Sequence, residues 1–206
     1  MLSHKISGIG PQIRSGVSVS CSGDFFRRIR CVVFFALTPP PSIKLAIDAW
    51  RDKAFPSFTS PVKANNFHIT LAFLGQITEA QLDSLSQYIE GHLKIKSFPL
   101  TLDYLGYWSK PKALWIGNAV VPQPQRDLVE LLHKAALQSG VSMQKRDYIS
   151  HLTLARKCLD NPPAPLIEPD FTFKNTELTL YESISTDHGV MYRPLIEWPF
   201  APTFSF

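Results

Sequence analysis

The sequence predicts an α+β protein in which short strands are mixed with three helices in two lobes. Short runs of β-branched and aromatic residues are typical of buried strands. Three longer segments repeat apolar residues at helical spacing. Pro122 and Pro124 mark the expected junction between the two halves of the chain.

Seven segments are predicted to be strands. The first, residues 31–37, is a continuous apolar run that fits a central strand. The others are expected at residues 67–74, 98–108, 113–121, 150–156, 171–182 and 191–198. The Pro-rich residues 161–169 are expected to form a loop.

Three segments are predicted to be helices. Ser42 is expected to cap a helix over residues 42–54. A second helix begins after Thr78 and repeats leucines and isoleucine at helical spacing. The third covers residues 125–139 and ends at Gly140, a residue type that favours the left-handed conformation found after helices.

The composition is that of a soluble globular protein. The 206 residues are 45% hydrophobic and 18% charged, and no run reaches the roughly 18–20 apolar residues of a membrane-spanning helix. The formal charge of +4 lies entirely in residues 1–30, which carry five basic and one acidic side chains (5 − 1 = +4). The folded part is therefore not expected to bind along an extended phosphate backbone. Any RNA recognition should come from a local site that binds one end of an RNA chain.

Residues 1–29 differ from the rest of the chain. They are rich in Ser, Gly and Arg and show no sustained periodicity. They are expected to be a flexible extension or an added leader in front of one bilobal domain over residues 30–206. The three cysteines are an odd number without metal-ligand spacing, which indicates a reduced, cytoplasmic protein.

The most informative feature is a repeated His-x-Thr motif. His68-Ile-Thr70-Leu-Ala returns 83 residues later as His151-Leu-Thr153-Leu-Ala. Six histidines and eleven threonines in 206 residues predict about 0.3 such triplets by chance (6 × 11/206), so two copies with shared Leu and Ala indicate a site. Because strand side chains alternate between faces, each His and its Thr should point the same way.

Paired imidazole and hydroxyl groups suit the hydrolysis of a cyclic phosphate. One imidazole can be neutral and act as a general base while the other is protonated and acts as a general acid. Threonine hydroxyls can donate hydrogen bonds to phosphate oxygens as charge develops there. The sequence has no His-x-His, Cys-x-x-Cys or His-Glu-x-x-His spacing, so neither a metal nor another cofactor is expected.

The motifs continue as His68-Ile-Thr-Leu-Ala-Phe-Leu-Gly75 and His151-Leu-Thr-Leu-Ala-Arg156. With them the sequence resembles the two-histidine phosphoesterase superfamily, and within it the RNA 2′,3′-cyclic phosphodiesterase branch, also called the 2′-5′ RNA ligase family. The resemblance spans about residues 31–200 and is strengthened by Cys31-Val-Val-Phe-Phe-Ala-Leu37, Leu114-Trp-Ile-Gly117 and Leu180-Tyr-Glu-Ser183.

The resemblance implies two similar lobes of antiparallel sheet with helices, facing each other across a central groove with one motif from each. It implies hydrolysis of RNA 2′,3′-cyclic phosphate ends to 2′-phosphates, with reversible 2′-5′ ligation of tRNA halves. His68 would protonate the leaving 3′ oxygen, His151 would activate water, and Arg156 would contact the substrate. Ser150 is a departure, because many relatives have Pro just before the second motif.

Four other side chains are candidates for substrate binding. Thr70 and Thr153 are expected to contact phosphate oxygens. Arg156 would add positive charge near a phosphate, although a basic residue at a strand end is as often simply solvated. Phe73 is placed on the His68 side of its strand, where it lines the cleft and stacks on a base, or else belongs to the core.

Three other functions stay open at this point. The same residues could act on a small nucleotide or an ADP-ribose cyclic phosphate, with a different flanking pocket. The protein could be an idle module that binds RNA ends, although binding alone does not need a paired acid and base. A metal-binding function is disfavoured by the missing ligand spacing. We expect RNA ends as partners, no membrane partner, and a monomer.

Overall fold

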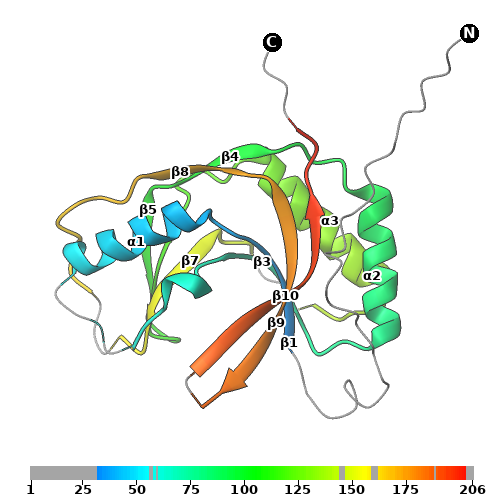
Figure 1. The fold of residues 1–206 in the computed structure, drawn as a ribbon, viewed down its shortest axis with the longest axis horizontal. Helices are drawn as coiled ribbons and strands as arrows, with labels where there is room; N and C mark the ends of the chain where they lie inside the picture. The colour runs from blue at the N-terminus through cyan, green and yellow to red at the C-terminus, as the bar shows by residue number, and fades with distance from the viewer. Residues whose placement is uncertain are drawn as a thin grey trace, which may run out of the picture.

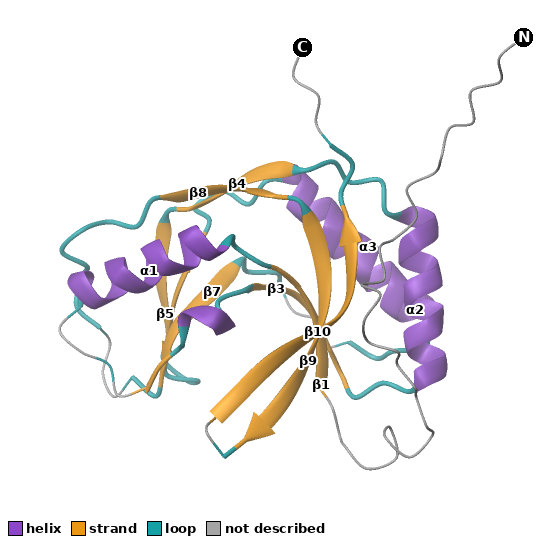
Figure 2. Cartoon of the chain, in the orientation of Figure 1, coloured by secondary structure: helices purple, strands orange, loops and turns teal. Residues whose placement is uncertain are grey.

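The computed structural model describes residues 32–202 except 56–57, 59, 144–146, 159–161 and 188. The predictions for residues 1–29 lie outside the described residues. The helices are α1 (Pro41–Ala54), α2 (Glu79–His92), α3 (Gln123–Gln138) and the 3₁₀ helix η1 (Ala64–Asn66). The strands are β1 (Val32–Leu37), β2 (Ser60–Pro61), β3 (Ile69–Gly75), β4 (Phe98–Leu102), β5 (Tyr104–Trp108), β6 (Ala113–Gly117), β7 (His151–Arg156), β8 (Phe171–Asn175), β9 (Glu177–Thr186) and β10 (Gly189–Pro199). Figure 2 shows how strands and helices are distributed.

One antiparallel sheet carries both motifs. Its strands follow the order β10–β9–β1–β3–β7–β6–β5, and β2 pairs with β7 outside this path. The strands β4 and β8 form a separate antiparallel pair. The motif-bearing strands β3 and β7 are therefore neighbours in the middle of the sheet. The predicted α+β class with antiparallel sheet is confirmed.

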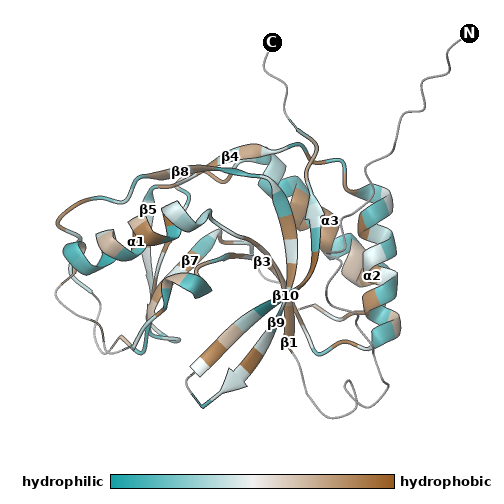
Figure 3. Ribbon diagram, viewed as in Figure 1, coloured by the Kyte–Doolittle hydropathy of each residue, from teal (hydrophilic) through white to brown (hydrophobic). Residues whose placement is uncertain are grey.

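The helices cover different parts of the sheet. Helix α3 packs on α2 and on β3, whereas α1 contacts η1 and β8. Figure 1 shows α2 and α3 beside the half that contains β1, β9 and β10, and α1 beside the half that contains β5 and β7. Hydrophilic residues lie along the outer sides of α1 and α2 (Figure 3). The division into two lobes across a groove stays a prediction.

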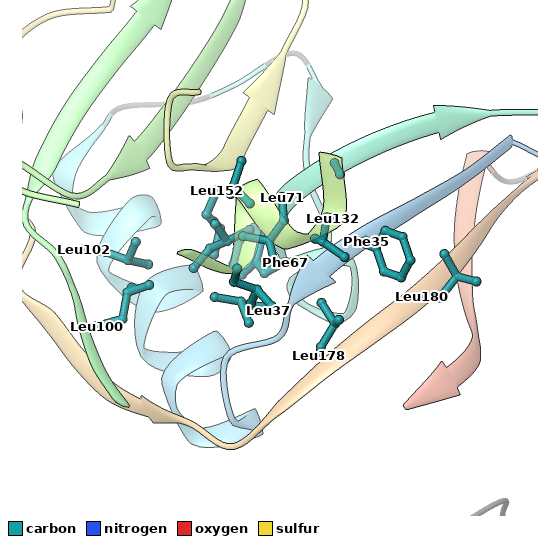
Figure 4. Close-up of a cluster of buried hydrophobic side chains, with 14 of the residues drawn as sticks. Phe35, Leu37, Phe67, Leu71, Leu100, Leu102, Leu132, Leu152, Leu178 and Leu180 are labelled. Carbon is teal, nitrogen blue, oxygen red and sulfur yellow. The ribbon is translucent and has the colours of Figure 1, made fainter. Parts of the chain in front are cut away.

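The two halves share one hydrophobic core. Phe35 and Leu180, from β1 and β9, belong to the same buried cluster as Leu152 from β7, and Figure 4 shows these side chains together. Because Phe35 points into this cluster, its neighbour Phe34 points to the opposite face of the sheet. There its ring lies 4.9 Å from the ring of His68, so the two faces of the sheet have different roles.

Most predicted elements are confirmed, with corrections at their ends. Thr78 caps α2 in a capping box with Gln81, and Gly140 follows α3 with φ 65°. Helix α1 begins at Pro41 with Pro40 at the N-cap, so the predicted Ser42 cap is wrong. Proline is favoured in the first turn of a helix because the backbone N–H groups there have no partner within the helix, so a residue without an N–H loses no hydrogen bond.

Two predicted strands are each divided in the structure. Residues 98–108 form β4 and β5, which belong to different sheets and meet at Asp103. The Asp103 N–H donates to the Gly117 carbonyl, and its carboxylate accepts from the Ala119 N–H. Residues 171–182 likewise divide between β8 and β9, so the chain changes sheets where a single strand was expected.

Candidate active site

The strands β3 and β7 bring the two motifs together with opposite directions. Ile69 faces Leu152 in the antiparallel ladder between them. Continuing this register by one residue each way places His68 opposite Thr153, and Thr70 opposite His151. Each histidine therefore lies beside the threonine of the other motif, related by an approximate two-fold axis.

Both motifs contain a β-bulge at the same leucine. On β1 the successive residues Phe35 and Ala36 pair with Ala72 and Thr70 of β3, so Leu71 has no partner on β1. On β7 the partners step from Ala155 to Thr153, which leaves Leu154 extra. A bulge inserts one residue and resets the alternation of side chains. The shared Leu-Ala pair of each motif is therefore buried together on the core side.

The bulges return the sixth residue of each motif to the histidine face. Phe73 on β3 pairs with Phe34 on β1, and the Phe34 ring contacts the ring of His68. Strict alternation would have put Phe73 beside Ile69, so the bulge gives it the side that was predicted for it. Phe73 is 59% exposed. Arg156 is exposed at the equivalent position of β7, so the two motifs present a ring and a cation at matching places.

Each imidazole is held through its Nδ1 atom by a backbone carbonyl two residues earlier. His68 Nδ1 lies 2.7 Å from the Asn66 oxygen, and His151 Nδ1 lies 2.8 Å from the Ile149 oxygen. A carbonyl oxygen can only accept, so Nδ1 carries the proton in both rings. This tautomer leaves Nε2 of each ring as the atom that can take or give a proton.

Aromatic rings surround both histidines. The His68 ring centroid lies 4.9 Å from that of Phe34 and 4.7 Å from that of Tyr192, which meets it edge-on. The His151 ring meets Trp108 edge-on at 4.6 Å and Trp115 at 6.3 Å. These rings remove water from the imidazoles and restrict their rotation.

Burial and neighbouring cations favour the neutral form of both imidazoles in the free protein. Burial lowers the pKa of His68 to about 4, and the hydrogen bond to Asn66 only partly opposes this. Positive charge on His151, Lys44 and Arg156 makes a smaller contribution to this lowering of the His68 pKa. Burial also lowers the pKa of His151, and the Arg156 charge adds to that effect. Arg156 therefore acts on both imidazoles.

The carbonyl that holds His68 is fixed by a 3₁₀ turn. In η1 the N–H of Asn66 donates to the Lys63 carbonyl, and the N–H of Phe67 donates to the Ala64 carbonyl. The Asn66 side chain also donates to the Val190 carbonyl at 2.8 Å, which ties η1 to β10. The acceptor of His68 Nδ1 is thus part of a small rigid turn.

The segment that holds His151 rests on a buried polar network. The Gln125 amide on α3 donates to the Tyr148 hydroxyl at 2.8 Å and to the Ser150 hydroxyl at 2.9 Å. Ser150 is buried and donates in turn to the Asn118 side chain. The departure noted at Ser150 is therefore accommodated by hydrogen bonds that a proline could not make.

Comparison with known proteins shows which family the chain belongs to. The family model described as LigT like Phosphoesterase matches residues 37–115. The RNA 2′,3′-cyclic phosphodiesterase of Escherichia coli (strain K12) is 33% identical over 167 residues, which covers 81% of this chain and 94% of the relative. The chain belongs to the LigT-like phosphoesterase family. This establishes the family that the motifs predicted.

Solved structures support the same family. A crystal structure described as phosphoesterase superposes with a TM-score of 0.78 at 31% identity, over 84% of this chain and 99% of that one. The E. coli LigT structure complexed with 3′-AMP gives a TM-score of 0.75 at 32% identity, over 82% of this chain and 98% of that one. That relative therefore holds a 3′-phosphorylated nucleoside.

Within the described residues, no group of three or more His, Cys, Asp or Glu side chains is placed to hold a metal ion. In the same part of the chain, no helix is both long and apolar enough to cross a membrane.

The structure brings together the residues predicted from the two motifs and adds others. His68, Thr70, His151 and Thr153 share one sheet face, with Phe73 and Arg156 at its matching outer positions. The site residues missed from the sequence lie on other strands and on α1: Phe34, Lys44, Trp108, Trp115, Tyr181 and Tyr192. The sequence does contain a signal for Trp115 and Tyr181, because each stands between two buried residues, in Leu-Trp-Ile and Leu-Tyr-Glu. Side chains alternate along a strand, so an aromatic in this position points to the face opposite the core.

Proposed function

We propose that the protein hydrolyses 2′,3′-cyclic phosphates at RNA ends to 2′-phosphates. The observation that supports this most directly is the pairing of two His-x-Thr motifs on adjacent antiparallel strands, with both Nδ1 atoms held by carbonyls. Such a site presents two Nε2 atoms and two hydroxyls around one small anion. The relative from E. coli carries the name RNA 2′,3′-cyclic phosphodiesterase.

In the proposed mechanism, the neutral Nε2 of His151 takes a proton from water as the water oxygen bonds to phosphorus. The bond from phosphorus to the 3′ oxygen breaks in line, and Nε2–H of His68 gives its proton to that oxygen. Thr70 and Thr153 donate to the non-bridging oxygens. Arg156 adds charge that draws the phosphate towards both imidazoles.

The acid role of His68 depends on the substrate. At neutral pH a group with a pKa of about 4 is almost entirely unprotonated. A bound phosphate anion favours the protonated imidazole and raises its pKa. In the free site His68 is therefore a neutral base, and binding of the substrate creates the acid. If a 5′-hydroxyl replaced water, the same steps would form a 2′-5′ linkage, so ligation of tRNA halves belongs to the proposal.

The experiment is incubation of the protein with an oligonucleotide that ends in a 2′,3′-cyclic phosphate, in excess EDTA. Identification of the product isomer tests the proposal. We expect a 2′-phosphate and no loss of rate in EDTA, because the mechanism uses imidazoles and hydroxyls. Binding without hydrolysis would indicate an idle RNA-end-binding module, and a 3′-phosphate product would contradict the proposed geometry. Gel filtration and cell fractionation test the proposed monomer and its cytoplasmic location.

A further inference from the structure

A pocket beside His68 is not used by the proposed hydrolysis. It is lined by residues of α1, η1, β9 and β10, including Lys44, Asn65, Asn66, Tyr181 and Tyr192. His68 forms part of its wall, whereas no residue of the second motif does. The pocket therefore adjoins the proposed active site at His68.

The pocket contains a cation whose charge is not balanced locally. Lys44 Nζ donates to the Asn65 carbonyl at 3.3 Å. No carboxylate of the described chain lies within ion-pair distance of it. Burial lowers the pKa of Lys44, as expected for an ammonium group that is partly removed from water. A partly buried, unbalanced ammonium group favours an anionic ligand.

The two cations of the site, Arg156 and Lys44, differ in which histidines they act on. Arg156 acts on both imidazoles, whereas Lys44 is among the groups that act on His68 and not among those that act on His151. Arg156 therefore lies near both histidines, whereas Lys44 lies with His68 in the wall of the pocket, where it is available to a second anion. An RNA 3′ end has this arrangement, because its last ribose carries the cyclic phosphate and, at its 5′ oxygen, the preceding phosphate.

We propose that Lys44 binds the 5′-phosphate of the nucleotide whose 2′,3′-cyclic phosphate lies between His68 and His151. The inference rests on the proposed function and specifies its substrate class as a nucleotide with a 5′-phosphate, not a bare nucleoside. The Tyr192 ring packs edge-on against His68 at 4.7 Å and, with Tyr181, forms the wall along which the ribose lies.

The test compares three substrates that differ only at the 5′ position. They are adenosine 2′,3′-cyclic phosphate with a free 5′-hydroxyl, the same compound with a 5′-phosphate, and a dinucleotide ending in the same cyclic phosphate. The first arm lacks the second anion, the second carries it as a small nucleotide, and the third carries it as an RNA chain. The measured quantity is the ratio of kcat/KM for each phosphorylated substrate to that for the 5′-hydroxyl substrate.

The variants isolate the charge of Lys44. We expect a ratio of about ten in the wild type, as for one hydrogen bond to a charged group. Lys44→Met should reduce the ratio to near one, and Lys44→Arg should retain most of it. Lys53→Met, at an exposed position of the same helix, is the matched control and should leave the ratio unchanged. Absolute rates can shift in Lys44→Met because Lys44 also acts on His68, so the ratio is the readout.

The outcomes separate this inference from the proposed function. A ratio near one in the wild type overturns the Lys44 site without any variant, even while hydrolysis itself is observed. A high ratio that persists in Lys44→Met also overturns it. No hydrolysis of any of the three compounds would instead contradict the proposed function. Equal gains for the mononucleotide and the dinucleotide support a site for the phosphate alone, and a larger gain for the dinucleotide supports a site for an RNA chain.

Discussion

His68 of the free protein should titrate near pH 4, far below an ordinary histidine. One pKa unit corresponds to about 1.4 kcal/mol between charged and neutral forms. A lowering from 6.5 to about 4 therefore corresponds to about 3 kcal/mol. Burial is the largest cause, so the value should persist at high salt, which screens only the contributions of the neighbouring cations.

The same shift links folding stability to pH. The unfolded chain binds a proton at this imidazole near pH 6.5, whereas the folded chain binds it near pH 4. As the pH falls between these values the unfolded state is favoured, so up to about 3 kcal/mol of unfolding free energy is lost across that window. Above pH 6.5 this contribution is fully present. His68→Phe should remove this component of the pH dependence.

The measurement is a pH titration of the protein labelled with ¹³C in its histidine rings, followed by NMR. The His68→Phe spectrum identifies the His68 signal. Addition of inorganic phosphate should move the midpoint upward, because an anion in the site favours the charged imidazole. A midpoint at 6.5 or above in the free protein would refute the reasoning, and with it the conclusion that the substrate creates the acid.

Four further outcomes are expected. The pH profile of kcat/KM, which reports the free enzyme, should have both limbs below pH 6.5, and the limbs of kcat should lie at higher pH because the phosphate raises both values. Gly117→Ala should destabilise the fold by about 1–3 kcal/mol in thermal unfolding, because its Cβ would lie 2.1 Å from the Ser150 carbonyl oxygen. Gly91→Ala is the control, since nothing lies within 4 Å of its Cβ. Gln125→Leu should cost about 1–3 kcal/mol in chemical denaturation, because the Tyr148 and Ser150 hydroxyls lose the hydrogen bonds that the Gln125 amide donates, and unchanged stability would mean that the network is dispensable. A chain without residues 1–29 should keep its specific activity, because every proposed catalytic residue follows them; a folded but inactive truncation would contradict this.

The sequence was sufficient to predict the centre of the site. His68 and His151 stand in equivalent strand contexts, and two copies of one motif are a signal that local pattern analysis can detect. The α2 cap at Thr78 and the turn at Gly140 were also predictable, because both depend on residues a few positions apart. The α+β class followed from the periods of the apolar residues.

What the sequence did not predict depends on contacts between distant segments. The bulges at Leu71 and Leu154 arise from how β3 and β7 pair with their neighbouring strands. Without the bulge at Leu154, strict alternation would place Arg156 on the core face of the sheet. The position of Lys44 beside His68 requires α1 to lie against η1. The division of residues 98–108 between two sheets depends on pairing with β6 and β8, which no local pattern encodes.

The most direct test of the central claim distinguishes the general acid from the general base among the two histidines. Rates of His68→Ala and His151→Ala are compared on a cyclic-phosphate oligonucleotide and on an analogue whose 3′ oxygen is replaced by sulfur, a leaving group that needs little protonation. Each variant should lose ~10²–10⁴-fold on the natural substrate. The analogue should restore His68→Ala and leave His151→Ala slow. Rescue of His151→Ala instead would exchange the two roles, and near wild-type hydrolysis by both variants would contradict the two-histidine mechanism.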